Sequence, residues 1–123
     1  MPEVVYSNLK DGEIMKVVIV GCGKIGRSIL KNLTEEGHSV CVIDRDPKVV
    51  RSIGDDYDVM CVNASGKDIE ELKSAEVSSA ELFIAASAND DAKMLSCCFA
   101  RSLGAAHTVA RFNDAEHYTN ADY

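Results

Sequence analysis

A glycine-rich segment follows the first long apolar run of the sequence and has the spacing G-x-G-x-x-G. Its first glycine permits a tight turn, its second lets the backbone approach a pyrophosphate, and its third lets the following helix pack on the preceding strand. The helix start then presents free N–H groups and the positive end of its dipole to phosphates. We therefore predict a phosphate site, with a lysine adding a mobile positive charge, at Gly21, Cys22, Gly23, Lys24, Ile25 and Gly26.

An acidic residue, Asp44, stands at the end of the second apolar run. A carboxylate there accepts hydrogen bonds from both hydroxyls of an adenosine ribose and repels a 2′-phosphate. This favours NAD(H), ATP, ADP or AMP over NADP. Alternatively, Asp44 only caps a loop, as Asp46 is expected to do; the agreement of strand, glycine segment and acid favours ribose binding. The neighbouring Arg45 is interpreted as leaning over the adenine or staying solvated, although it could also accept a 2′-phosphate.

The elements that must position these residues alternate with a short period. Apolar, β-branched runs predict strands at 17–20, 39–43, 58–62, 81–86 and 108–112. Four helices are predicted between them. The first helix places Ile25, Ile29, Leu30 and Leu33 on one side and stops at Gly37. The second is capped by Asp46 with Pro47 at its first position, and the third opens with a Ser65-x-x-Asp68 capping box. The fourth is capped by Asn89 or Asp90 and ends at Gly104.

Strands separated by helices indicate βαβ units. The predicted fold is α/β, a three-layer, Rossmann-type, doubly wound parallel sheet with strand order 3-2-1-4-5. A complete Rossmann domain has a sixth strand, and no apolar run remains for one, so we expect a fragment of a longer protein. Residues 1–14 are interpreted as an N-terminal extension, either a short extra strand or disordered, and residues 15–123 as the nucleotide-binding domain.

The composition excludes several classes of function. The chain has 123 residues and a net charge of −7, which is the wrong sign for a nucleic-acid binder. No apolar run is long enough to span a membrane, and no leader pattern precedes a cleavage site, so a cytoplasmic protein without direct membrane insertion is expected. A G-x-x-x-x-G-K-[ST] loop is also absent, which argues against P-loop nucleotide hydrolysis.

The cysteines and histidines predict neither a metal site nor a catalytic centre. Five cysteines without a C-x-x-C pair suggest buried thiols that behave as small hydrophobes. The three histidines lack ligand spacing and are expected at the surface or at strand edges; they are His38, His107 and His117. An NAD-dependent dehydrogenase is the alternative interpretation. That enzyme class would need a substrate domain that supplies a general acid or base beside the nicotinamide.

Five runs of the sequence occur in a recognisable order: IVGCGKIGRSIL, VIDRDP, AELFIAAS, DDAKMLSCCFARSLG and TVARFNDAEHY. Together they resemble the N-terminal domain of Trk/Ktr potassium-transport regulatory subunits, known as the TrkA-N, KTN or RCK N-terminal domain. The resemblance implies a cytoplasmic, non-enzymatic subunit that binds NAD(H) or an adenine nucleotide. It also implies assembly on a membrane potassium transporter or channel, peripheral to the inner face of the membrane.

The resemblance also implies roles for particular residues. The glycine segment would hold the phosphates and Asp44 the ribose; Asn63, Ala64 and Ser65 would border the adenine, and Ser87 would line the rest of the site. The sequence departs from the family after the third strand, where either Asn63 replaces an aspartate or Gly66 is a displaced glycine. It also has Lys93-Met94 where the family favours Asn-Met.

The fourth predicted helix is apolar over more than one face, with Met94, Leu95, Cys97, Cys98, Phe99 and Leu103. One face must pack on the sheet, and the excess is explained by a crowded core or by a self-association surface. Because the resembling domains are oligomeric, we favour a homodimer or a higher homo-oligomer.

Overall fold

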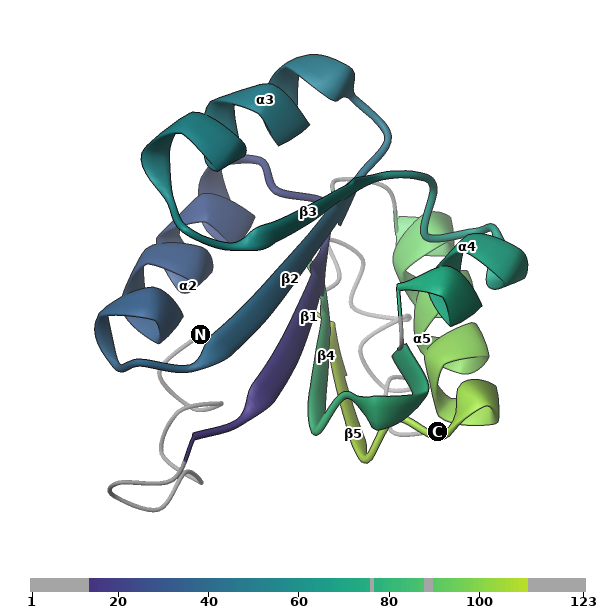
Figure 1. The fold of residues 1–123 in the computed structure, drawn as a ribbon. Helices are drawn as coiled ribbons and strands as arrows, with labels where there is room; N and C mark the ends of the chain where they lie inside the picture. The colour runs from purple at the N-terminus through teal and green to yellow at the C-terminus, as the bar shows by residue number, and fades with distance from the viewer. Residues whose placement is uncertain (1–13, 76, 88–89, 111–123) are drawn as a thin grey trace.

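The computed structural model describes residues 14–75, 77–87 and 90–110. Five strands alternate with helices along this part of the chain (Figure 1). The elements are β1 (Lys16–Val20), α2 (Lys24–Glu35), β2 (Ser39–Asp44), α3 (Pro47–Asp56), β3 (Met60–Asn63), α4 (Ile69–Ser74), the 3₁₀ turn η1 (Val77–Ser79), β4 (Leu82–Ala85), α5 (Asp90–Leu103) and β5 (His107–Ala110).

The five strands form one parallel sheet in the order β3-β2-β1-β4-β5, as predicted. Helices α2 and α3 cover one face, and α4 and α5 cover the other (Figure 1). The chain therefore changes direction across the sheet between β1 and β4, whose carboxyl ends lie side by side. The predicted three-layer, doubly wound fold is confirmed. The extension at 1–13, the Asn89 cap and residues 111–123 lie outside the described residues.

The central strand β1 is buried on both sides, which explains its continuous apolar, β-branched sequence. Val17 and Ile19 pack on the side of α2 and α3, in a cluster with Leu30, Leu33 and Ile53. The alternate residues of β1 belong to the second cluster, on the side of α4 and α5; this cluster includes Val18, Val20, Leu72, Phe83 and Ala100. The period-two alternation of the strand thus divides its side chains between two cores.

Three helix ends agree with the predictions made from the sequence, and one differs from them. Gly37 and Gly104 adopt positive φ after α2 and α5, as predicted. Asp46 caps α3 by accepting from the backbone N–H of Lys48. The predicted capping box is wrong: Ser65 Oγ accepts from the N–H of Lys67 in a turn, and Asp68 is the cap. An aspartate carboxylate can accept from two N–H groups and carries a charge that favours a helix start, so it displaces the serine from this role.

The helix α2 buries Ile29, Leu30 and Leu33 as predicted, but not Ile25, which is 50% exposed. Ile25 lies in the first turn of α2, within the glycine segment. In this turn Gly26 is the buried residue and approaches the Gly21 carbonyl, so Gly26 rather than Ile25 takes the inward position. Helical spacing alone put Ile25 in the core, whereas its place along the helix puts it beside the predicted phosphate site.

A side-chain cluster joins α2 to α3. The Arg27 guanidinium donates to Ser52 Oγ at 3.1 Å, pairs with the Asp56 carboxylate, and lies 6.0 Å from the centre of the Tyr57 ring. Because the Arg27 and Asp56 side chains are both substantially exposed, the ion pair adds little stability by itself. The cluster does provide polar and ring contacts between α2 and the second half of α3.

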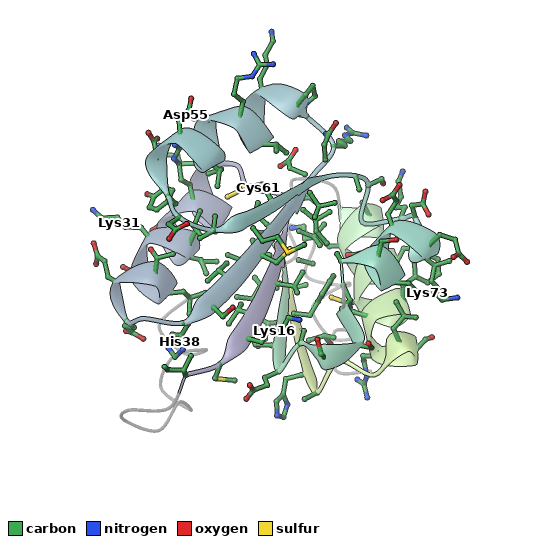
Figure 2. The ribbon with its side chains drawn as sticks, in the orientation of Figure 1. Lys16, Lys31, His38, Asp55, Cys61 and Lys73 are labelled. Atoms are coloured by element: carbon green, nitrogen blue, oxygen red, sulfur yellow. The ribbon has the colours of Figure 1, made fainter. Side chains whose placement is uncertain are left out.

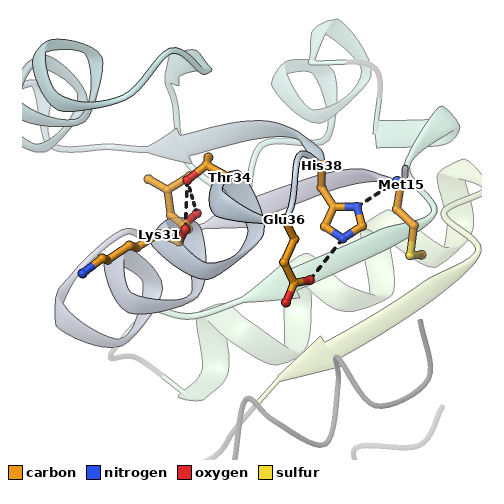
Figure 3. A network of polar contacts seen from close by, with 6 residues as sticks. Met15, Lys31, Thr34, Glu36 and His38 are labelled. Atoms are coloured by element: carbon orange, nitrogen blue, oxygen red, sulfur yellow. Dashed lines mark hydrogen bonds and ion pairs between the residues drawn. The ribbon is translucent and has the colours of Figure 1, made fainter. Parts of the chain in front are cut away.

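His38 directly precedes β2, which agrees with the strand-edge alternative, but its side chain is only 4% exposed, so the surface alternative is wrong for it. His38 Nδ1 accepts from the backbone N–H of Met15 at 3.0 Å, and Nε2 lies 3.4 Å from Glu36 Oε2 (Figure 3). The imidazole therefore joins the turn before β2 to the start of β1. His107, the first residue of β5, is exposed as predicted. Within the described ranges, no helix is long and apolar enough to cross a membrane.

Candidate functional site

The carboxyl ends of β1, β2 and β4 meet around the glycine segment. The N–H of Gly21 donates to the carbonyl of Ile43 at 2.8 Å, so the first glycine continues the pairing of β1 with β2. On the other side, the N–H of Ala86 donates to the carbonyl of Val20 at 2.8 Å. The segment after β1 is therefore held between the ends of its two neighbouring strands. This is the edge where doubly wound sheets bind ligands.

Two of the three glycines are required by the fold itself. Gly21 has a φ of +84°, and a Cβ there would lie 2.7 Å from the Cα and N of Ser87. A Cβ on Gly26 would lie 2.5 Å from the carbonyl oxygen of Gly21. Substitution at either position would therefore force backbone movement. These contacts also place Ser87, after β4, directly beside the glycine segment, close to where the predicted ligand would pass.

The middle glycine differs from the other two. A Cβ on Gly23 would meet nothing within 4 Å, and its φ of −77° is accessible to any residue. The fold of the unliganded chain does not need glycine here. Open space over a glycine at the start of a helix is what close approach of a phosphate requires.

The start of α2 is left without a side-chain cap, and its first turn contains no acidic residue. By contrast, α3 and α4 are capped by the carboxylates of Asp46 and Asp68. The N–H groups at the start of α2 therefore face open space next to Gly23, while the exposed Lys24 adds a positive charge. The arrangement is suited to an anion.

Asp44 ends β2 and is half-buried beside the glycine segment. Its Oδ2 accepts from the N–H of Cys22 at 2.7 Å, and its Oδ1 accepts from the N–H of Asp46 at 2.9 Å. The loop-capping role considered for Asp44 is thus observed. A carboxylate has about four acceptor positions, so these two bonds leave room for ribose hydroxyls. Ribose binding stays a prediction.

The residues after β3 lie beside Asp44. The side-chain amide of Asn63 and the N–H of Ala64 both donate to the Asp44 carbonyl, at 2.9 and 3.0 Å. Ser65 follows in the turn described above, and Arg45, the residue after Asp44, is exposed. The structure therefore brings the predicted adenine-bordering residues next to the predicted ribose acceptor.

Gly66 was considered only as a displaced family glycine, and the structure gives it a packing role. A Cβ on Gly66 would lie 2.5 Å from Val20 Cγ1 and 3.2 Å from the Cβ of Ser96. Gly66 thus lets the segment after β3 pass close to the end of β1 and to α5. Asn63 and Gly66 have separate positions, one beside Asp44 and one under α5. In the sequence, the one sign of this close approach is the isolated glycine after the third strand.

The thiols near the site are not activated. Burial, followed by the nearby Asp44 carboxylate, raises the pKa of the Cys22 thiol from an ordinary 9.0 to about 11. Burial raises the pKa of Cys97 to about 11 and also raises the pKa of Cys61, which lies on the side of β3 that faces α3 (Figure 2). Protonated thiols are poor nucleophiles, which agrees with the structural role predicted for the cysteines.

We predict that alkylation will separate the cysteines by their environment. In the folded monomer at pH 8, iodoacetamide should modify the exposed Cys98 first and should leave Cys22, Cys41 and Cys97 unmodified. In 6 M urea, all should react. Mass mapping of the modified peptides measures this. Modification of Cys22 as fast as Cys98 would contradict the burial described here.

In the part of the chain that the structure describes, no group of three or more His, Cys, Asp or Glu side chains could hold a metal ion. The sheet order, the glycine segment and the adjoining carboxylate define a Rossmann-type domain. The TrkA-N domain model matches residues 17–122, and the chain belongs to the TrkA-N domain family.

The most similar relatives include Trk system potassium uptake proteins. A TrkA homolog from Methanothermobacter thermautotrophicus is 32% identical over 103 residues, which are 84% of this chain and 48% of that protein. TrkA from Streptomyces coelicolor is 35% identical over 101 residues, covering 81% of this chain and 45% of that protein. The chain thus spans about half the length of these relatives.

Solved structures share the fold at lower identity. The GsuK channel bound to NAD matches 92% of this chain and 20% of its own length, with a TM-score of 0.78 and 21% identity. GsuK has also been solved bound to ADP, and it matches with a TM-score of 0.77. The enzyme WbmG from Bordetella bronchiseptica, in complex with NAD and UDP, matches 80% of this chain and 38% of its own length, with a TM-score of 0.62 and 18% identity.

Proposed function

We propose that this chain is a regulatory domain of a potassium transport system that binds NAD(H) or an adenine nucleotide and gates its transporter through ligand-dependent assembly. The observation that carries the proposal is the open, uncapped start of α2 at Gly23 beside the Asp44 carboxylate, in a member of the TrkA-N family. The relatives named above are potassium uptake proteins, which supports a role in potassium transport.

The ligand is proposed to lie along the carboxyl edge of the sheet. Its ribose would bind Asp44, its phosphates would lie over Gly23 and the start of α2, and its adenine would rest against the segment from Asn63 to Ser65. Arg45 would then stand at the outer side of the adenine. The GsuK structures with NAD and with ADP support both ligand classes for such a fold. The carboxylate of Asp44 disfavours NADP, because a 2′-phosphate would meet a negative charge.

Self-association is proposed to use the outer face of α5. Leu95 is 39% exposed, and Cys98, one turn further on, is also exposed. Phe99 and Leu103 pack instead against the core, so the apolar excess of this helix is divided between the core and the surface. A homodimer or higher homo-oligomer would cover the exposed pair. The domain would act on the cytoplasmic side of the membrane through its transporter partner.

An oxidoreductase is the alternative, since the enzyme WbmG, solved in complex with NAD, has a fold of this kind. Among the described residues, the two histidines lie at the amino edge of the sheet: His38 precedes β2, and His107 begins β5. The predicted ligand lies at the opposite edge. Neither histidine can therefore serve as a general acid or base beside it.

The proposal is tested by nucleotide binding together with assembly. The purified chain is titrated with NAD⁺, NADH, ATP, ADP and AMP by calorimetry, and its mass with and without each ligand is followed by light scattering. We expect at least one of these ligands to bind and to change the oligomer mass. No heat with any of the five would overturn the proposal. Steady NADH oxidation with a small carbonyl substrate would support the oxidoreductase instead.

A further inference from the structure

Two hydrogen bonds hold the chain where it enters the sheet, at the edge opposite the glycine segment. His38, in the turn before β2, accepts at Nδ1 from the backbone N–H of Met15 at 3.0 Å (Figure 3). The carbonyl of Met15 in turn accepts from the N–H of Ser39 at 3.0 Å. Met15 directly precedes β1. Both polar groups of its backbone are therefore bonded to the start of β2.

The two bonds respond differently to acid. An imidazole nitrogen accepts a hydrogen bond only while it carries no proton, so the bond from Met15 requires a neutral His38 with its proton on Nε2. When the ring is protonated, both of its nitrogens are donors, and Nδ1–H would face the N–H of Met15. Protonation of His38 and this bond therefore exclude each other. The bond from Ser39 joins two backbone groups, which do not titrate.

The carboxylate of Glu36 offers a protonated ring a partner. Glu36 Oε2 lies 3.4 Å from Nε2 of His38, the ring nitrogen that does not bond Met15 (Figure 3). An imidazolium in this place would keep a charged partner at Nε2 while it loses its acceptor at Nδ1. The proton can therefore release Met15 although the ring stays in the turn.

The other charged groups on the neighbouring elements have different surroundings. Lys16 Nζ donates to Ser79 Oγ at 2.7 Å, and Glu81 Oε1 accepts from the backbone N–H of Lys16 at 3.3 Å, so both side chains bond on the side of β1 that faces β4. Three more titratable groups near this edge are exposed, and the ring of a fourth lies near Arg27: Glu35, Asp58, His107 and Tyr57. Glu36 is therefore the carboxylate with which a protonated His38 would pair.

We propose that His38 is an acid-sensitive anchor: protonation of its imidazole releases the backbone of Met15 from the turn before β2 and loosens the point where the chain enters the sheet. A free imidazole changes its charge at about pH 6.5, so the anchor responds in the range in which few other side chains titrate. The inference is independent of the proposed nucleotide, because the anchor lies at the amino edge of the sheet and the glycine segment at the carboxyl edge.

The test measures the hydrogen exchange of single backbone amides by NMR, relative to an unfolded peptide at each pH. Because the released form takes up a proton, the protection of the Met15 amide should fall about tenfold from about pH 7.5 to about pH 5.5. Gly21, at the other end of β1, donates to the carbonyl of Ile43, and its amide should keep its protection. This comparison separates local release from acid unfolding of the whole chain.

The main variant is His38→Asn, whose amide oxygen can accept from Met15 but does not titrate. Its Met15 protection should not depend on pH. The matched control is His107→Asn, which removes an exposed imidazole at the start of β5 and should leave the tenfold fall in place. Glu36→Gln changes an exposed side chain and removes the partner of the imidazolium, so it should make the fall smaller.

Thermal unfolding establishes which variants are folded, and Glu36→Gln decides the question should His38→Asn fail to fold. Unchanged protection of Met15 in the wild type would overturn the inference. So would a fall of the same size in a folded His38→Asn variant, or an undiminished fall in Glu36→Gln. None of these results would bear on nucleotide binding at the opposite edge.

Discussion

Replacing Gly23 by aspartate is expected to abolish nucleotide binding while making the folded chain slightly more stable. A side chain at this position meets no neighbour within 4 Å, and its φ of −77° suits any residue. Aspartate is a preferred helix cap, so capping α2 should raise the free energy of unfolding by about 0.3–1 kcal/mol. The same carboxylate would occupy the proposed phosphate position with a negative charge, which should weaken binding by at least about a hundredfold.

Two other glycines provide the controls. Gly54→Asp makes the same charge change at an exposed position with open space around it, and it should leave the affinity unchanged. Gly21→Ala should lower stability, because its Cβ would meet the backbone of Ser87 at a positive φ. Urea unfolding and calorimetry measure the two quantities separately. Wild-type affinity in a folded Gly23→Asp variant would show that the start of α2 does not hold the phosphates.

Asp44→Ala is expected to reduce both affinity and stability, because the carboxylate has two roles in the structure. The variant loses the ribose acceptor, which should weaken adenine nucleotides by about ten- to a hundredfold. It also leaves the N–H groups of Cys22 and Asp46 without their acceptor. We expect the free energy of unfolding to fall by roughly 1–3 kcal/mol.

Asp46→Ala separates the two roles of Asp44. It removes a helix cap two residues away, at a cost of about 0.5–2 kcal/mol, without touching the proposed ribose acceptor. Nucleotide preference should therefore be unchanged in Asp46→Ala, whereas the preference for NAD over NADP should shrink in Asp44→Ala. Calorimetry with NAD and NADP measures this preference. Equal binding of NAD and NADP by the wild type would contradict the assignment of Asp44 to the ribose.

The strands and the topology could be predicted because the signals that define them are local and agree with one another. β1 is apolar and β-branched throughout because helices cover both of its faces, and each following strand is separated from the next by a helix that begins or ends at a glycine or an aspartate. Such a pattern is compatible with few sheet topologies. The strand boundaries were less certain: β3 begins at Met60 rather than at Asp58, because pairing with β2 decides where a strand begins.

The wrong predictions share a physical cause, which is the position of a residue relative to elements distant in sequence. Ile25 has helical spacing with Ile29, yet in the first turn of α2 it is Gly26 that approaches the Gly21 carbonyl and Ile25 that is exposed. His38 is polar and close to a turn, yet the N–H of Met15, just before β1, gives it a buried partner. Ser65 and Asp68 are both good caps, and the course of the backbone after β3 places the aspartate at the start of α4.

The candidate site was predictable in its glycine segment and acid, whose spacing reflects backbone geometry. The part of the site on the side of α5 could not be predicted. The close approach of Gly66 to Val20 and Ser96 depends on how α5 crosses the sheet.

The hydrogen bond from Cys22 to Asp44 also affects how a ligand would be received. Because the carboxylate is tied to the glycine segment before any nucleotide arrives, the ordering of its side chain has already taken place during folding. Association then has less rotamer entropy to overcome at the ribose contact. The carboxylate and the backbone of the glycine segment are already joined by this bond, so a nucleotide that bound as proposed would meet contacts arranged before its arrival.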